Sequence, residues 1–313
     1  MKKGILYTSL VVALTGFIAT NTVAQQSTRH SNYLFNKLIV NPAAAGSNDY
    51  IEIMAGYRKD WVGFSGSPRT AFFSIDGSAL QKRIGLGLQV VNEELGAYTS
   101  TGIVGTVASR VRIARENYLS FGLSGGYFSN SLNGNMLDVR ENDDLAIPES
   151  NQHLGIFDLR AGVFYKDPKN FAGFSVFNVL EPVLNYSGNE RAVAGTADRH
   201  YYFFAGRQFR ANADIDVIPS FLYKFTEEGN GQLDLNAKAM YQDRIGLGLS
   251  YRHETSVSVI AEFFPTEFLR FGYAYDFFTN DIRRSSSGSH EIMVAYRIIQ
   301  NKRLTENPRY LFN

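Results

Sequence analysis

The pattern in this sequence that could do covalent chemistry is Gly122-Leu123-Ser124-Gly125-Gly126, which fits the G-x-S-x-G spacing of hydrolase nucleophiles. That motif works because its serine lies on a sharp turn between a strand and a helix, next to a histidine. Here Ser124 continues the alternating run of Leu119, Phe121 and Leu123, and no helical pattern follows. The histidines fall in expected loops or at strand ends, and none pairs with Ser124; they are His30, His153, His200, His253 and His290. We expect no catalytic residue and no enzymatic activity.

A second candidate is the acidic run Glu141-Asn142-Asp143-Asp144, whose oxygens could bind calcium. It lacks the D-x-D-x-D-G spacing of a calcium loop, so a solvated loop is the simpler interpretation. We expect no metal and no other cofactor, although a ligand in the connection between Ser131 and Ile156 stays open. The 31 basic and 30 acidic residues nearly balance, which argues against a nucleic-acid partner.

The N-terminus has the features of a cleaved secretory signal, with Lys2-Lys3 followed by an apolar stretch and small residues up to Ala24. We therefore predict a signal peptide over residues 1–24. A periplasmic or plug segment would follow over 25–49, a membrane barrel over 50–300 and a polar tail over 301–313. No later stretch reads as 18 consecutive apolar residues, so any membrane span must be made of strands.

The elements that follow are alternating strands. Phe271, Tyr273 and Tyr275 form one face of a run whose other face is Gly272 and Asp276, and three other segments alternate in the same way. A barrel strand must show apolar side chains to lipid and small or polar ones to the lumen. We predict an all-β, antiparallel transmembrane barrel of about fourteen strands, with 12 or 16 as alternatives. A change such as Gly272→Ser, on the lumen face, is expected to be tolerated.

The connections between these strands alternate in length. We predict long connections from Asn92 to Tyr98 and from Ser131 to Ile156, and a compact one at Asp167-Pro168-Lys169-Asn170. Such barrels have short periplasmic turns and longer outer loops. Both chain termini are therefore expected on the periplasmic side of the outer membrane.

Three stretches near the N-terminus carry a family resemblance: Tyr33-Leu34-Phe35-Asn36, Asn41-Pro42-Ala43-Ala44-Ala45-Gly46 and Tyr57-Arg58-Lys59-Asp60-Trp61-Val62-Gly63-Phe64. The sequence resembles the PorP/SprF family of type IX secretion system membrane proteins. The resemblance implies a role in exporting large cargo proteins with C-terminal sorting domains, such as gliding adhesins, or in attaching them to the cell surface. The partners it implies are the outer-membrane lipid bilayer, secretion-machine proteins on the periplasmic side and the cargo. A general diffusion porin or small-solute transporter is the alternative.

The segment from Tyr33 to Gly46 has many apolar residues and no strand partner of its own. Such residues are expected to plug the lumen or to dock on a partner. We predict a partner-binding site made of Tyr33, Leu34, Phe35, Leu38, Asn41, Pro42, Arg58 and Trp61. An internal plug is the alternative interpretation of the same residues.

Overall fold

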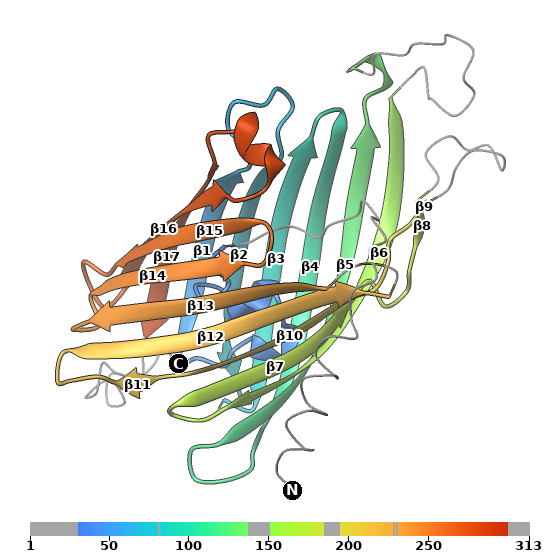
Figure 1. Cartoon of the computed structure of the whole chain (residues 1–313). Coiled ribbons are helices and arrows are strands. Elements are labelled where there is room, and N and C mark those ends of the chain that lie inside the picture. The colour runs from blue at the N-terminus through green and yellow to red at the C-terminus, as the bar shows by residue number, and fades with distance from the viewer. Residues whose placement is uncertain are drawn as a thin grey trace, which may run out of the picture.

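The computed structural model describes residues 31–80, 82–136, 151–184, 195–227, 229 and 231–299. These residues form a closed 14-strand antiparallel barrel, which confirms the predicted fold (Figure 1). Its strands are β1 Tyr50–Lys59, β2 Arg69–Ala79, β3 Ile84–Leu95, β4 Tyr98–Arg112, β5 Tyr118–Leu132, β6 Gln152–Lys166, β7 Asn170–Phe177, β10 His200–Arg207, β12 Ile215–Thr226, β13 Gln232–Tyr241, β14 Ile245–Arg252, β15 Ser256–Phe263, β16 Leu269–Phe278 and β17 Ser289–Ile299.

Strands that lie side by side in the barrel wall are also consecutive barrel strands along the chain. The first and last strands close the wall, with Tyr50 opposite Ile299. The short β11 (Phe209–Arg210) continues along β12, while β8 (Val183–Leu184) and β9 (Gly195–Thr196) form a separate two-stranded sheet. Closure satisfies the backbone groups that an open sheet would leave exposed to lipid.

The two faces of the wall follow the predicted pleat. Phe271 on β16 is 43% exposed on the outer face, whereas its neighbours Arg270 and Gly272 are buried on the lumen face. The same alternation runs through β14, where Leu247 is exposed and Ser250 is buried. The apolar outer face and polar inner face are those of a barrel that spans a membrane.

Two connections differ from the prediction. Asn92 belongs to β3, which continues to Leu95 and pairs directly with β4, so Gly96-Ala97 is a two-residue turn. Gly96 has a φ of 56°, as the first position of such a tight turn requires. The strand β6 begins at Gln152, ahead of the expected start near residue 157. The end of β3 and the start of β6 have a sequence pattern that predicts loops. The reason is that these parts of the strands are polar and extend past the length that a bilayer needs.

No helix among the described residues is long and apolar enough to cross a membrane. Three predicted features lie outside the described residues. They are the signal peptide over residues 1–24, the tail over 301–313 and the acidic run at 141–144.

Candidate functional site

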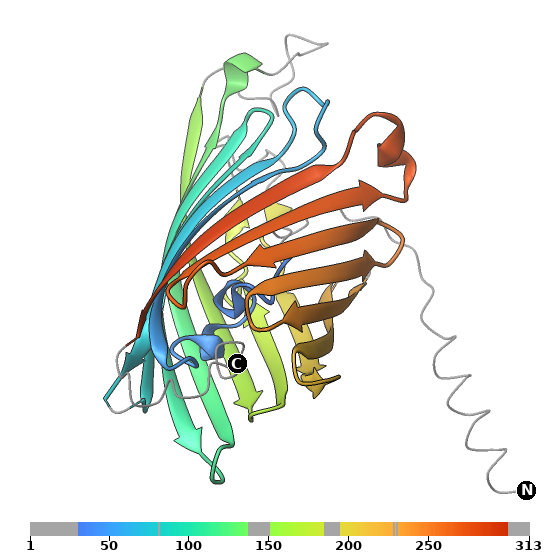
Figure 2. The ribbon, with the colours of Figure 1, turned by 90° about the vertical axis from the view of Figure 1, so that its left-hand side faces the viewer.

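The N-terminal segment occupies the inside of the barrel. Residues 31–46, here called the plug segment, run through the lumen as two single turns of 3₁₀ helix, η1 (Lys37–Ile39) and η2 (Pro42–Ala44) (Figure 2). Asn36 and Asn41 cap these turns by accepting hydrogen bonds from Leu38 N and Ala43 N. Because the residue before proline avoids helical geometry, Asn41-Pro42 separates the two turns.

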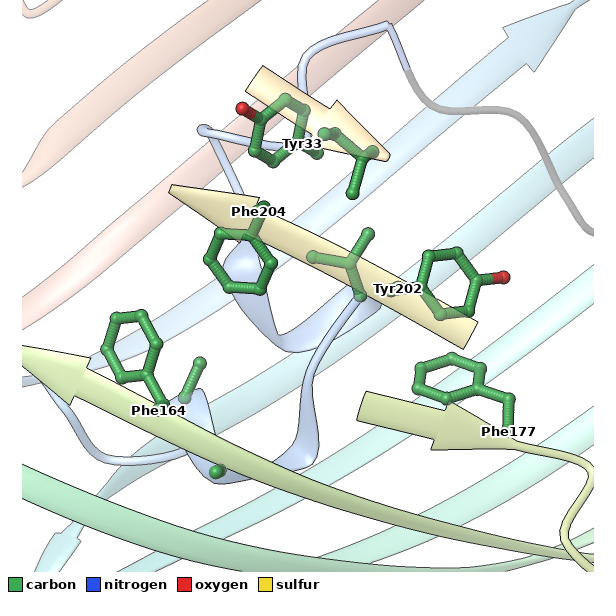
Figure 3. Packing of buried hydrophobic residues seen from close by; sticks show 9 residues of the cluster. Tyr33, Phe164, Phe177, Tyr202 and Phe204 are labelled. Carbon is green, nitrogen blue, oxygen red and sulfur yellow. The ribbon is translucent and has the colours of Figure 1, made fainter. Parts of the chain in front are cut away.

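Aromatic packing fixes one side of the plug segment against the wall. Tyr33, Val40 and Ala43 belong to a buried cluster completed by five wall residues: Phe164, Phe177, Tyr202, Phe204 and Leu222 (Figure 3). The Tyr33 ring meets that of Phe204 edge-on, with centroids 6.1 Å apart, and its hydroxyl donates to Ser220 Oγ over 3.0 Å. The segment is therefore packed like a protein core.

Glycines in the wall allow the backbone of the plug segment to approach. A Cβ atom added at Gly85 would lie 1.9 Å from Ala45 O, and one at Gly122 would lie 2.3 Å from Ala43 N. Asn41 Nδ2 donates to the carbonyls of Val163 and Phe174, at 2.9 and 3.3 Å, on the facing strands β6 and β7. No side chain larger than hydrogen fits at those two glycines while the plug segment is in place.

A buried charge network holds the start of the plug segment. Arg58 contacts Asp60 and Asp276 at 2.6 Å each and Glu291 at 3.3 Å. Ser31 joins it, since its backbone N–H donates to Glu291 and its hydroxyl to Asp276. The Arg58 side chain is 1% exposed, so these acceptors must compensate its buried positive charge.

A second charged cluster lies beneath the plug segment. Glu262 accepts from Arg270 at 3.0 Å and pairs with Lys238 at 3.3 Å, and Asn32 donates to it at 2.9 Å. Burial, together with the neighbouring charges of Lys238 and Arg270, lowers the pKa of Lys37 in the plug segment to about 7. Its Nζ lies 4.7 Å from the centre of the Phe171 ring.

Above the plug segment lies a cavity of about 760 Å³, here called the vestibule. Ile39 and Val40 line it from the plug segment, and residues next to the long connections line its upper part, among them Trp61, Asp158 and His200. A pocket of about 40 Å³ lies between the plug segment and the wall, lined by Lys37 and Glu52 among others. The plug segment thus lines both cavities, with Ile39 and Val40 at the vestibule and Lys37 at the small pocket.

The structure brings the predicted partner-binding residues together inside the barrel. Six of them belong to the plug segment: Tyr33, Leu34, Phe35, Leu38, Asn41 and Pro42. Arg58 lies in the buried charge network, and Trp61 lines the vestibule from the connection after β1. Partner binding by these residues stays a prediction, and in this arrangement it would require the plug segment to leave the lumen. Sequence reasoning did not single out Asp276, Glu291 and Glu262 as members of this site. The only indication in the sequence was that each is an acidic residue at a lumen-facing position.

The candidate nucleophile Ser124 lies inside β5 on the lumen face. Its hydroxyl is 2.7 Å from that of Thr106 on β4. Within the part of the chain that the structure describes, no group of three or more His, Asp or Glu side chains could hold a metal ion.

Comparison with known families gives the assignment. The family model described as type IX secretion system membrane protein PorP/SprF matches residues 22–296. The chain belongs to this family. It is therefore a membrane component of the type IX secretion system, and as a β-barrel it lies in the outer membrane, associated with other parts of the machinery. No curated protein matches the sequence.

Several solved structures are similar to this chain at low sequence identity. Omp33, an outer membrane protein of Acinetobacter baumannii, is 7% identical, with a TM-score of 0.46 over 81% of this chain and 99% of that one. A FadL homologue of Pseudomonas aeruginosa is 12% identical, with a TM-score of 0.47 over 86% and 94%. The toluene transporter TodX of Pseudomonas putida is 12% identical, with a TM-score of 0.47 over 87% and 95%.

Proposed function

We propose that this protein assists the export or the surface attachment of large secreted cargo. It would act at the cell-surface end of a barrel whose lumen is plugged. The observation that carries the proposal is the plug segment, which is packed into the lumen by aromatic contacts, hydrogen bonds and buried ion pairs. The vestibule gives the barrel a concave surface at the end where the long connections lie. A protein that handles cargo needs such a surface, whereas it needs no open pore.

The alternative, a diffusion porin or small-solute transporter, requires a continuous path through the lumen. The plug segment argues against it, because it is packed into the lumen and its Ile39 and Val40 form part of the vestibule wall. An enzymatic role is also disfavoured, since the Ser124 hydroxyl pairs with a threonine hydroxyl and lies within a regular strand.

The proposal includes an orientation. Tyr50 at the start of β1 pairs with Ile299 at the end of β17, so both lie at the same end of the barrel. That end is opposite the two longest connections, which follow β5 and β7. Barrels of this class keep short turns in the periplasm, so the vestibule would open to the cell surface.

The test removes the protein from the cell. We expect the surface and medium proteomes to lose cargo proteins with C-terminal sorting domains, while uptake of small sugars is unchanged. Liposomes that contain the purified barrel should swell no faster in those sugars than empty ones. Slower uptake with an unchanged proteome would favour the transporter instead.

A further inference from the structure

Within the described residues, one strand of the barrel wall is paired on only one side for half of its length. The strand β6 pairs with β5 along its whole length, from Gln152 opposite Leu132 to Lys166 opposite Tyr118. With β7 it pairs only from Ala161 to Lys166. Figure 1 shows the first half of β6 standing beyond β7 on the taller side of the barrel.

The backbone direction on β6 identifies which groups lie on the open side. Residues of an antiparallel strand direct their N–H and C=O groups alternately to the two neighbours. Leu159 O accepts from Val179 N, just after β7, so the odd-numbered residues face away from β5. The N–H and C=O groups of His153, Gly155 and Phe157 therefore face the open side, and no described strand pairs with them there.

Neither the end of β7 nor the short hairpin after it continues the sheet. Asn178 and Glu181 have φ values of 55° and 44°, which turn the chain away after Val179. The following strands, β8 and β9, pair with each other. The free edge of β6, here residues 153–157, is thus about 17 Å of preformed strand, held straight by its pairing with β5.

The position of this edge favours an aqueous setting. With 15 residues, β6 exceeds the roughly 9–11 that a tilted strand needs to cross a bilayer, and its first half lies at the end with the long connections. Unpaired backbone groups within the hydrocarbon would cost several kcal/mol each, so the edge belongs outside it. In the orientation proposed above, that is the cell surface.

Natural edge strands are usually protected by prolines, bulges or charged side chains. The outward residues here are His153, Gly155 and Phe157, and the Phe157 ring is 69% exposed and meets Tyr127 edge-on. On the inner face the same stretch borders the vestibule, where Ile156 and Asp158 are among the lining residues. An added strand would place alternate side chains over Phe157 and into the vestibule.

We propose that the free edge of β6 binds an extended segment of a secreted polypeptide by strand addition at the mouth of the vestibule. Only another backbone offers donors and acceptors at the spacing of a strand edge, which is why the ligand must be a polypeptide. Its residues that face outward should be apolar, to pack on Phe157. This inference rests on the surface-side role proposed above and names the site where that role is carried out.

The test uses the full-length protein in whole cells, with Phe157→p-benzoyl-phenylalanine as a photoreactive probe and Leu247→p-benzoyl-phenylalanine as the control on β14, where the native side chain is 60% exposed. We expect the probe at 157, and not the one at 247, to cross-link a secreted polypeptide. The absence of cysteine in the sequence lets each product be isolated through a single added thiol tag.

Adding His153→Pro and Gly155→Pro removes two edge N–H groups without touching the bonds to β5. The matched pair His153→Ala and Gly155→Ala also removes the imidazole and adds a Cβ at 155, near the Tyr127 hydroxyl, but keeps both N–H groups. Strand addition predicts that the proline pair lowers the cross-linked yield at least about tenfold relative to the alanine pair. Heat-dependent gel migration checks that both barrels fold.

Several results would overturn the inference. These are a cross-link only to this chain or to a second copy, equal yields from the two pairs, or no cross-link at 157 in cells that still export cargo. The last result would leave the proposed function in place, because export is measured separately. An unchanged proteome after removal of the whole protein would instead refute the proposed function itself.

Discussion

The substitution Gly122→Val tests whether the plug segment depends on close backbone approach to the wall. A Cβ atom at this position would lie 2.3 Å from Ala43 N and 2.5 Å from Ala43 Cα. Gly125 lies on the same strand, and an added Cβ there meets nothing within 4 Å, so Gly125→Val is the matched control.

The expected size of the effect follows from these contacts. Overpacking a filled interior costs about 1–3 kcal/mol. To yield, the turn η2 must also weaken two hydrogen bonds, from Asn41 Nδ2 to Val163 O and from Ser175 Oγ to Val40 O, each worth about 0.5–1.5 kcal/mol. The total of about 2–6 kcal/mol should shift the plug segment towards the undocked state by at least about thirtyfold.

The assay measures access to Lys37 in the purified, folded barrel. Trypsin should cleave after Lys37 in Gly122→Val much faster than in Gly125→Val or the natural sequence, because the docked segment is held inside the lumen. Conductance across a planar bilayer should rise in parallel. Equal cleavage and conductance in the two valine variants would refute the reasoning. Loss of folding in Gly122→Val alone would show that the plug segment is required for barrel assembly.

Three further outcomes are expected. Cysteine at Ser285, in the connection between β16 and β17, should react with an impermeant thiol reagent on whole cells, and cysteine at Lys169 or Thr266 should not; equal labelling would contradict the orientation. Phe271→Arg should impair assembly, at a cost of about 2–4 kcal/mol near the membrane midplane, whereas Phe271→Leu should assemble normally on a heat-modifiability gel. Arg58→Ala should destabilise the barrel by about 3–5 kcal/mol in urea unfolding, because it removes the nearest cation from the buried carboxylates of Asp60 and Asp276; an effect under 1 kcal/mol would show that water replaces the arginine.

The strands could be predicted from sequence because lipid imposes a simple rule on every second residue. Phe271 faces outward as expected. The connection predicted from Ser131 to Ile156 is an exception, because β6 already begins at Gln152. The exception has a physical cause. Gln152 to Ile156 extend beyond the length needed for the membrane, so no lipid constraint marks them as strand.

The buried partners of the plug segment could not be predicted in the same way. The sequence indicates that Tyr33 and Phe35 must be buried against other side chains, but it does not identify those side chains. Tyr33 packs in a cluster with Phe204 and Leu222, which reach it only once the barrel closes and sets the register of its strands. The ion pairs of Arg58 with Asp276 and Glu291 have the same origin, since each joins residues more than 200 positions apart.

Glycines on the lumen face illustrate what the register adds to the pattern. Alternation alone places Gly272 in the lumen and suggests that serine would be tolerated there. In the structure, a Cβ atom at Gly272 would lie 2.7 Å from Cε2 of the buried Phe35 ring. Small residues face the lumen at such positions because they leave room for the plug segment, whereas an open water-filled channel would accept larger polar side chains. The glycines along the inner wall therefore mark the positions where the plug segment passes closest to the wall.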